Sequence, residues 1–348
     1  MNLFSSFIFS ISEKHQNTFY RIFSESGTVW TLTNTAKNMG SPLLVIASDA
    51  QHAEAIEQAC RFFAPELPCA IFPDWETLPY DHFSPHQEII SERLKLLYEL
   101  PHWQQGIIVI ALNTLLVRLA PKSYLMQKVF LIKPCQKFLW KKLQEDLQIA
   151  GYHAVNQVML PGEYAIRGSI CDIYPTGQKQ AFRLDFFDNE IDTIRGFDPE
   201  TQRSTEKINE LKILPAHEFP LDEEGIKTFR ENFRQNFSIN LADCSLYNAV
   251  SNGESPPGIE YYLPLFFKET ASVFDYLPQK TVIFTPANLS ILIERQWQYL
   301  NERYEQYAHD RRHPILFPKQ VFLSVEEINA HLKDFLVVDC LRRRIKRV

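Results

Sequence analysis

Residues 43–48 read LLVIAS, an uninterrupted apolar run that ends in a serine. A strand covered by helices on both faces shows such a run, so this stretch predicts a buried strand of a parallel sheet. The run IIVIA at 107–111 repeats the pattern. Between the two runs, apolar residues at helical spacing predict a helix (Ile56, Ala59, Cys60 and Phe63). Strands that alternate with helices predict an α/β domain built on a parallel sheet.

The same pattern extends in both directions along the chain. Residues 17–23 are expected to form a first strand, and residues 27–39 a helix. Far downstream, the strand-like TVIFT at 281–285 is followed by a long helix over about 287–307. The α/β domain is therefore expected to be built from two pieces of the chain.

A different pattern separates these two pieces. After Pro121, a strand over 128–133 and a helix over about 136–150 precede short strand-like runs with hairpin-sized turns. This spacing predicts an antiparallel sheet backed by one helix. We therefore divide the chain into a first α/β part, an inserted α+β domain, and a second α/β part that ends in the start of a linker (1–121, 122–215 and 216–348).

Two helix starts carry a specific signal. Ser84 with Pro85 and Gln87 has the spacing of an N-cap, a first-turn proline and a capping box, which predicts a helix beginning at residue 85. Ser324 and Glu327 have the same spacing before the final helix.

Composition excludes several classes of protein. A formal charge of -6 is mild, so a protein that coats nucleic acid by charge alone is not indicated. None of the six cysteines forms a C-x-x-C pair, which argues against a zinc ribbon and indicates a reducing, cytoplasmic setting. No apolar run reaches 18 residues, so no membrane span is expected. No catalytic serine motif or metal-binding H-E-x-x-H motif is present, so we expect neither catalytic residues nor a metal site.

Strand alternation brings three notable side chains to one face of the inserted sheet. In FRLDFF (182–187), the odd positions Arg183 and Phe187 face away from the helix. In YAIRGSI (164–170), Arg167 points the same way. The residues expected toward the core are Tyr164, Ile166, Ile170, Phe182, Leu184 and Phe186. Arginine and aromatic residues anchor protein interfaces, although a merely solvated face is the favoured alternative from composition alone.

Residues 21–29, RIFSESGTV, lie where a phosphate-binding loop would follow the first strand. Aligned with G-x-x-x-x-G-K-[ST], only Gly27 matches. Ile22 replaces the first glycine, Thr28 the lysine, and Val29 the Mg²⁺-binding hydroxyl. One match in four leaves open whether this is the remnant of a nucleotide site.

Four long motifs carry a family resemblance: FPDWETLPYDHFSPHQEIISERL (72–94), LPGEYAIRGSICDIYPTG (160–177), RLDFFDNEIDTIRGFDPETQRS (183–204) and ILPAHEFP (213–220). They resemble the N-terminal part of the bacterial transcription-repair coupling factors (Mfd), and the resemblance is weakest before residue 40 and at the C-terminal end. That part of the family is similar to the excision-repair protein UvrB. It implies an α/β domain like UvrB domain 1 with a degenerate P-loop, and an inserted domain like UvrB domain 2.

The resemblance also implies a function. The positions that match the family's UvrA-contacting residues are Arg167, Arg183 and Phe187, so the chain is expected to recruit UvrA as a monomeric, non-catalytic adaptor. In the family, ATP and Mg²⁺ would be bound by motor domains, and RNA polymerase and double-stranded DNA by C-terminal domains. Neither set of domains is expected in this chain.

Several alternatives remain beside this reading. Ile22, Gly27, Thr28 and Val29 would form a site that does not bind ATP, whereas the rival function is an ATP-dependent helicase. A second rival is a general DNA-binding module that uses the basic tail LRRRIKRV (341–348). The loop PDWETLPYDHF is shorter than the DNA-probing hairpin of UvrB, so we expect Trp75 and Tyr80 to pin this loop to the core rather than to stack on bases.

Overall fold

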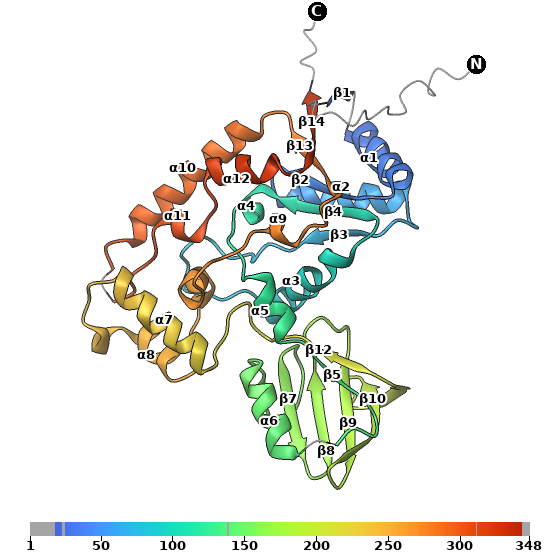
Figure 1. Ribbon diagram of the computed structural model, residues 1–348, viewed down its shortest axis with the longest axis vertical. Helices are drawn as coiled ribbons and strands as arrows, with labels where there is room; N and C mark the ends of the chain where they lie inside the picture. Colours follow the sequence, from blue (N-terminus) through green and yellow to red (C-terminus); the bar gives the residue numbers. More distant parts are fainter. Residues whose placement is uncertain (1–17, 23–24, 138, 311, 343–348) are drawn as a thin grey trace, which may run out of the picture.

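The computed structural model describes residues 18–22, 25–137, 139–310 and 312–342, and within these ranges it contains one parallel and one mainly antiparallel large sheet (Figure 1). The parallel sheet has the strand order β1–β14–β13–β2–β4–β3. Its strands are β1 (Thr18–Ile22), β2 (Pro42–Ala47), β3 (Cys69–Phe72), β4 (Gly106–Ala111), β13 (Val282–Pro286) and β14 (Leu336–Arg342). Strands from the early and the late part of the described chain thus build one sheet.

Helices cover both faces of this sheet, because neighbouring residues of its central strands are apolar and point in opposite directions. Leu43 and Val45 of β2 join the core beneath α1 (Glu25–Met39) and α2 (Ala50–Phe63). Leu44 and Ile46 join a larger core on the other face, with α3 (Gln87–Glu99), α10 (Leu289–Tyr307) and α12 (Val325–Leu332). All residues of β2 and β4 are buried, as the apolar runs predicted.

The remaining helices are short or lie at the periphery. They are α4 (Leu112–Leu115), α5 (Lys122–Gln127), α7 (Glu223–Asn236), α8 (Ser245–Ser251), α9 (Val273–Tyr276) and α11 (Pro318–Val321), with 3-10 turns at Leu100–His102, Leu241–Asp243 and Ile259–Phe266. Among the described helices, none has both the length and the hydropathy that crossing a bilayer requires.

The predicted start of α3 was wrong by two residues. The Ser84 hydroxyl donates to Glu260 Oε2 at 2.9 Å and accepts from the Gly258 N–H at 3.1 Å, so it does not cap the helix. His86 takes the N-cap position, with Nδ1 accepting from the Glu88 N–H at 3.4 Å. The capping box of Ser324 and Glu327 at α12 is confirmed.

The second sheet has the order β11–β10–β9–β8–β7–β6 and carries α6 (Trp140–Ile149) on one face (Figure 1). Its strands are β6 (His153–Ala154), β7 (Glu163–Arg167), β8 (Ile170–Tyr174), β9 (Ala181–Phe187), β10 (Glu190–Phe197) and β11 (Ser204–Ile208). The β7 to β11 pairings are antiparallel, and β6 pairs parallel with β7. A separate two-stranded antiparallel sheet consists of β5 (Phe130–Ile132) and β12 (Leu211–Ile213). It lies where the chain enters and leaves this domain.

Helix α3 anchors the inserted domain to the α/β part. Arg93 of α3 is fully buried, and its Nε donates to Glu218 Oε1 at 2.6 Å just after the inserted domain ends. Gln87 Nε2 donates to the Ala216 carbonyl at 2.9 Å, and Ser91 Oγ accepts from the Gly177 N–H at 2.8 Å. Breaking a buried pair such as Arg93–Glu218 costs about 3–5 kcal/mol, because one charge is left uncompensated.

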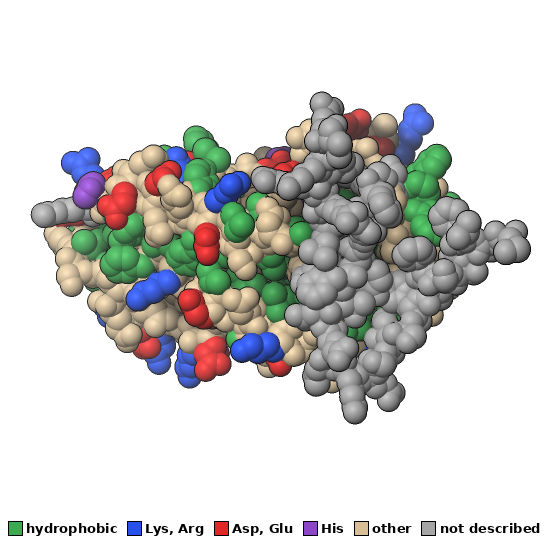
Figure 2. Space-filling view, turned by 90° about the horizontal axis from the view of Figure 1, so that it is seen from above, with side chains coloured by type: hydrophobic (Ala, Val, Ile, Leu, Met, Phe, Trp, Pro, Cys, Tyr) green, Lys and Arg blue, Asp and Glu red, His purple; other side chains and the backbone are tan. Residues whose placement is uncertain are grey.

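The surface of the parallel-sheet end is mixed in charge. Figure 2, seen from above, shows Lys and Arg side chains dispersed among Asp, Glu and apolar side chains over the described atoms of this face.

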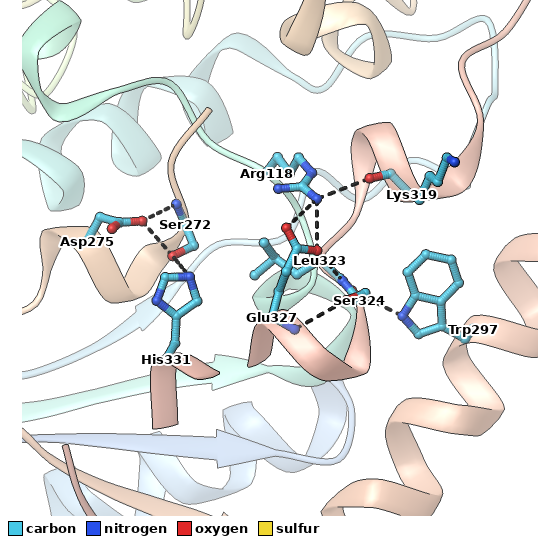
Figure 3. Close-up of polar contacts among 9 residues, drawn as sticks. All are labelled: Arg118, Ser272, Asp275, Trp297, Lys319, Leu323, Ser324, Glu327 and His331. Carbon is cyan, nitrogen blue, oxygen red and sulfur yellow. Dashed lines mark hydrogen bonds and ion pairs between the residues drawn. The ribbon is translucent and has the colours of Figure 1, made fainter. Parts of the chain in front are cut away.

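Polar contacts join the two α/β pieces (Figure 3). Arg118 of the first piece donates to Glu327 of the second at 2.7 and 2.9 Å and to the Lys319 carbonyl at 3.1 Å.

Candidate protein-docking surface

The exposed face of the second sheet brings Arg167, Arg183 and Phe187 together, as alternation predicted. Directly opposite residues in an antiparallel ladder share a face. Arg183 of β9 lies opposite Asp172 of β8, and Arg167 of β7 lies opposite Ile170. All of these residues therefore lie on the side of the sheet away from α6.

Asp172 holds both arginines in place. Its carboxylate is buried and accepts from Arg183 Nε at 2.6 Å and from an Arg183 terminal nitrogen at 2.9 Å. A terminal nitrogen of Arg167 donates to the same carboxylate. The hydrogen bonds that Arg183 donates to Asp172 raise the pKa of Arg183 above its ordinary value, so this guanidinium stays charged. One buried anion thus orients two cations, which leaves one positive charge for a partner.

The Arg183 guanidinium also lies over an aromatic ring. Its carbon is 5.0 Å from the centroid of the Phe197 ring, within cation–π range. Phe197 belongs to a small apolar cluster on this face with Val158, Ala165 and Ala181. The side chain of Arg183 is 19% exposed and that of Arg167 is 51% exposed, so Arg183 is the more rigidly held of the two.

Phe187 is an exposed apolar anchor at the end of β9. It is 76% exposed, whereas its neighbour Phe186 is buried and packs on Trp140 with ring centroids 4.1 Å apart. Large exposed aromatic residues beside fixed arginines are typical of interface hot spots.

Two of the residues expected in the core lie elsewhere. Ile170 shares the face of Arg167, because the two-residue turn at 168–169 places them directly opposite each other. Ile166 points toward the α6 side but is 36% exposed, since it lies near the end of β7. The other four expected core residues, Tyr164, Phe182, Leu184 and Phe186, are buried.

The stretch that aligns with a phosphate loop runs from the end of a strand into the start of a helix. β1 ends at Ile22 and α1 begins at Glu25, with residues 23–24 outside the described ranges. Gly27, Thr28 and Val29 lie in the first turns of α1 rather than in a loop, and the Gly27 carbonyl accepts from Thr31 Oγ1 at 2.8 Å. Val29 is buried against the sheet. A P-loop also begins its helix at these three positions, so what distinguishes this stretch is its side chains, with Thr28 in place of the lysine and Val29 in place of the Mg²⁺-binding hydroxyl.

A serine, a histidine and an aspartate gather near α9, but not in a catalytic order (Figure 3). The Ser272 N–H donates to Asp275 Oδ2 at 2.7 Å as part of a capping box, and Ser272 Oγ donates to the same oxygen at 2.7 Å. His331 Nε2 lies 3.4 Å from this hydroxyl. A catalytic triad needs the histidine between the other two. His331 instead stacks on Phe274, so this cluster is a helix cap.

Other parts of the chain bear on nucleic-acid and metal binding. Trp75 and Tyr80 are buried, which confirms that they pin their loop to the core. Among the described residues, no group of three or more His, Cys, Asp or Glu side chains could hold a metal ion. The basic tail mostly lies outside the described residues, since these end at residue 342.

The sequence of this chain is similar to those of known proteins. The model of the UvrB interaction domain family matches residues 131–219. The chain is 44% identical to the transcription-repair-coupling factor of Haemophilus influenzae over 293 residues, covering 84% of this chain and 26% of that protein. It is 40% identical to the Escherichia coli protein of the same name over 301 residues, covering 86% of this chain and 26% of that protein. The chain thus spans about a quarter of the length of these relatives.

Proposed function

The chain belongs to the transcription-repair coupling factor family, as the counterpart of its N-terminal UvrB-like region, and from this premise we propose that it is an adaptor that recruits UvrA. The observation that supports this proposal is the pair of arginines fixed by one buried carboxylate, on the same sheet face as an exposed phenylalanine. Guanidinium groups offer a rigid fork to carboxylates, and Phe187 offers apolar area that a partner can bury.

We assign no catalysis to this chain. The parallel-sheet part is proposed to be a UvrB domain 1-like fold whose nucleotide site is degenerate at Ile22, Thr28 and Val29. The second sheet with α6 is proposed to be UvrB domain 2-like. ATP, Mg²⁺, RNA polymerase and double-stranded DNA are proposed to act on parts of the longer relatives that lie beyond the matched region, while this part acts in the cytoplasm as a monomer.

The rival reading as a DNA-binding module has less support. The described face in Figure 2 has both signs of charge dispersed over it, whereas a protein that binds duplex nonspecifically presents a basic strip. On the inserted sheet, Asp172 neutralises one of the two arginines that it binds, so less positive charge remains there for phosphate.

Calorimetry with purified UvrA tests the proposal. Arg183→Ala is expected to weaken UvrA binding by about 1–3 kcal/mol, and the triple variant Arg167→Ala/Arg183→Ala/Phe187→Ala is expected to abolish capture in a pull-down. Lys141→Ala, on the outer side of α6, is the matched control and should bind as the wild type does. Equal capture of UvrA by the wild type and the folded triple variant would refute the docking role.

A further inference from the structure

A row of charged side chains crosses the exposed face from Asp172 through Arg183 to the far edge of the sheet. Strand pairing places Asp172 opposite Arg183, Arg183 opposite Arg195, and Arg195 opposite Lys207. Directly opposite residues share a face, so β8, β9, β10 and β11 contribute one acid followed by three cations in consecutive order. This row was not identified from the sequence, because it appears only once the register of the hairpins is known.

The row places like charges next to one another on the exposed face. Like charges directly opposite each other in a ladder repel. Among the described residues, neither Arg195 nor Lys207 has an ion-pair partner, and Arg195 Nε is buried without a hydrogen bond. A fold that keeps an unfavourable set of charges at one position indicates a role for these charges outside the fold.

The described acids of the same face do not neutralise Arg195 or Lys207. Asp172 binds Arg167 and Arg183. Asp185 accepts from Thr193 Oγ1 at 2.8 Å, and Glu163 accepts from the N–H groups of Met159 and Leu160 at 2.7 and 2.9 Å. Glu190 lies opposite Phe187 at the hairpin end of the strands, away from the row. None of these carboxylates makes an ion pair with Arg195 or Lys207 among the described residues.

We propose that the docking surface extends across β10 and β11 through Arg195 and Lys207, where it binds an acidic segment of the same protein partner. This inference rests on the proposed function, since it enlarges the surface of Arg167, Arg183 and Phe187. Lys207 is exposed and Arg195 is half-buried, so both are available to a partner.

The spacing of the cations defines the shape of the acidic segment. Side chains directly opposite on adjacent strands have Cβ atoms about 4.5–5.5 Å apart. Carboxylates three or four residues apart on one helix face are separated by about 5–6 Å. An acidic helix face that crosses the strands therefore matches Arg183, Arg195 and Lys207 in turn.

The surrounding chemistry favours a protein over a nucleic acid. Carboxylates of Asp172 and Asp185 lie among the cations of this face and lower the net positive charge that a phosphate backbone would meet. A partner protein can place its own donors over these acids and its carboxylates over the cations, whereas a duplex presents phosphates throughout.

The test is UvrA affinity of the full chain with charges reversed, Arg195→Glu/Lys207→Glu, measured at low and at moderate salt. We expect the dissociation constant to rise by about tenfold or more, with a weaker salt dependence than the wild type. Lys141→Glu/Lys142→Glu on α6 is the matched control with the same change in charge, on the opposite side of the sheet, and should stay within about twofold of the wild type. Arg195→Met/Lys207→Met replaces the reversed variant if circular dichroism shows that it does not fold.

The outcomes separate the inference from the proposed function. If the wild type binds UvrA and loses it in Phe187→Ala, yet the folded charge-reversed variant binds equally well, the extension is wrong and the adaptor role stands. If the wild type does not bind UvrA, the adaptor role itself fails. If charge reversal abolishes binding to a short duplex DNA and leaves UvrA binding unchanged, the row serves nucleic acid and the inference is overturned.

Discussion

Asp172 and Arg183 face each other across the β8–β9 ladder, and both oxygens of the buried carboxylate accept from the guanidinium, at 2.6 and 2.9 Å. This two-point contact fixes the plane of the guanidinium, because the fork of Arg matches the carboxylate. Arg167 donates to the same group from β7. The docking arginines are thus ordered before any partner arrives, which lowers the entropy that binding must overcome.

Asp172→Asn should therefore weaken UvrA binding although Asp172 need not touch UvrA. The amide accepts at one oxygen only, so one arginine loses its fixed position. We expect an affinity loss of about 1–3 kcal/mol and a similar loss of folding stability. Calorimetry and urea unfolding measure both, with the exposed Asp192→Asn as the isosteric control. Unchanged UvrA affinity in a folded Asp172→Asn variant would contradict the positioning role.

Phe186 and Phe187 should respond in opposite ways to the same change. Phe187→Ala removes a side chain that is 76% exposed, so UvrA affinity should fall while the free energy of unfolding stays within about 0.5 kcal/mol. Phe186→Ala empties a site against Trp140 and should cost about 3–5 kcal/mol of stability. Denaturant titrations of both variants check the contrast. A large stability loss in Phe187→Ala would mean that this ring supports the fold rather than a partner.

Nucleotide should not stabilise this chain. A site that binds the folded state raises stability by about 2.7 kcal/mol when ligand is at about 100 times its dissociation constant. Thr28 and Val29 lie within α1 and supply neither the lysine nor the hydroxyl that a P-loop uses. Thermal unfolding in millimolar Mg-ATP should match unfolding in Mg-tripolyphosphate. A specific rise with ATP would favour the helicase reading.

Features encoded within one segment could be predicted from the sequence. The runs of β2 and β4 and the capping box at Ser324 follow from neighbouring residues. The Ser84 cap was wrong because its hydroxyl binds Glu260, a partner 176 residues away that competes for the same group.

The docking face, too, could be predicted from the sequence only where neighbouring residues determine it. Alternation identified Arg167, Arg183 and Phe187 one strand at a time. Asp172 and Arg195 join them only through strand register, which depends on turn length and on the bulges of β10. A two-residue turn at 168–169 was the available signal for the placement of Asp172, since it pairs residue 167 with 170 and residue 165 with 172.

Two buried groups near the junction of the two domains should change the free energy of unfolding with pH in opposite directions. His217 and Glu260 line one cavity of about 220 Å³, together with Glu218 and His153. Burial lowers the pKa of His217 to about 4 from an ordinary value of 6.5. Burial raises the pKa of Glu260 to about 7 from 4.5, although Ser84 donates to its carboxylate.

The two groups act on stability with opposite signs. Between pH 4 and 6.5 the unfolded chain holds a proton on residue 217 that the folded chain lacks, so this histidine costs stability as the pH falls. Between pH 4.5 and 7 the folded chain holds a proton on residue 260 that the unfolded chain lacks, so this glutamate costs stability as the pH rises. Their contributions nearly cancel from pH 4.5 to 6.5.

Single substitutions should reveal how each group makes the free energy of unfolding depend on pH. In Glu260→Gln the histidine acts alone, so relative to the wild type the free energy of unfolding should increase with pH, by up to about 1.4 kcal/mol per pH unit. In His217→Phe, which keeps a ring against Phe219, the glutamate acts alone and the relative slope should be negative. Urea unfolding across pH 4.5 to 6.5 measures both, with the exposed Glu254→Gln as a control. Identical pH slopes in all four proteins would show that neither group is held in the ionisation state that its burial dictates.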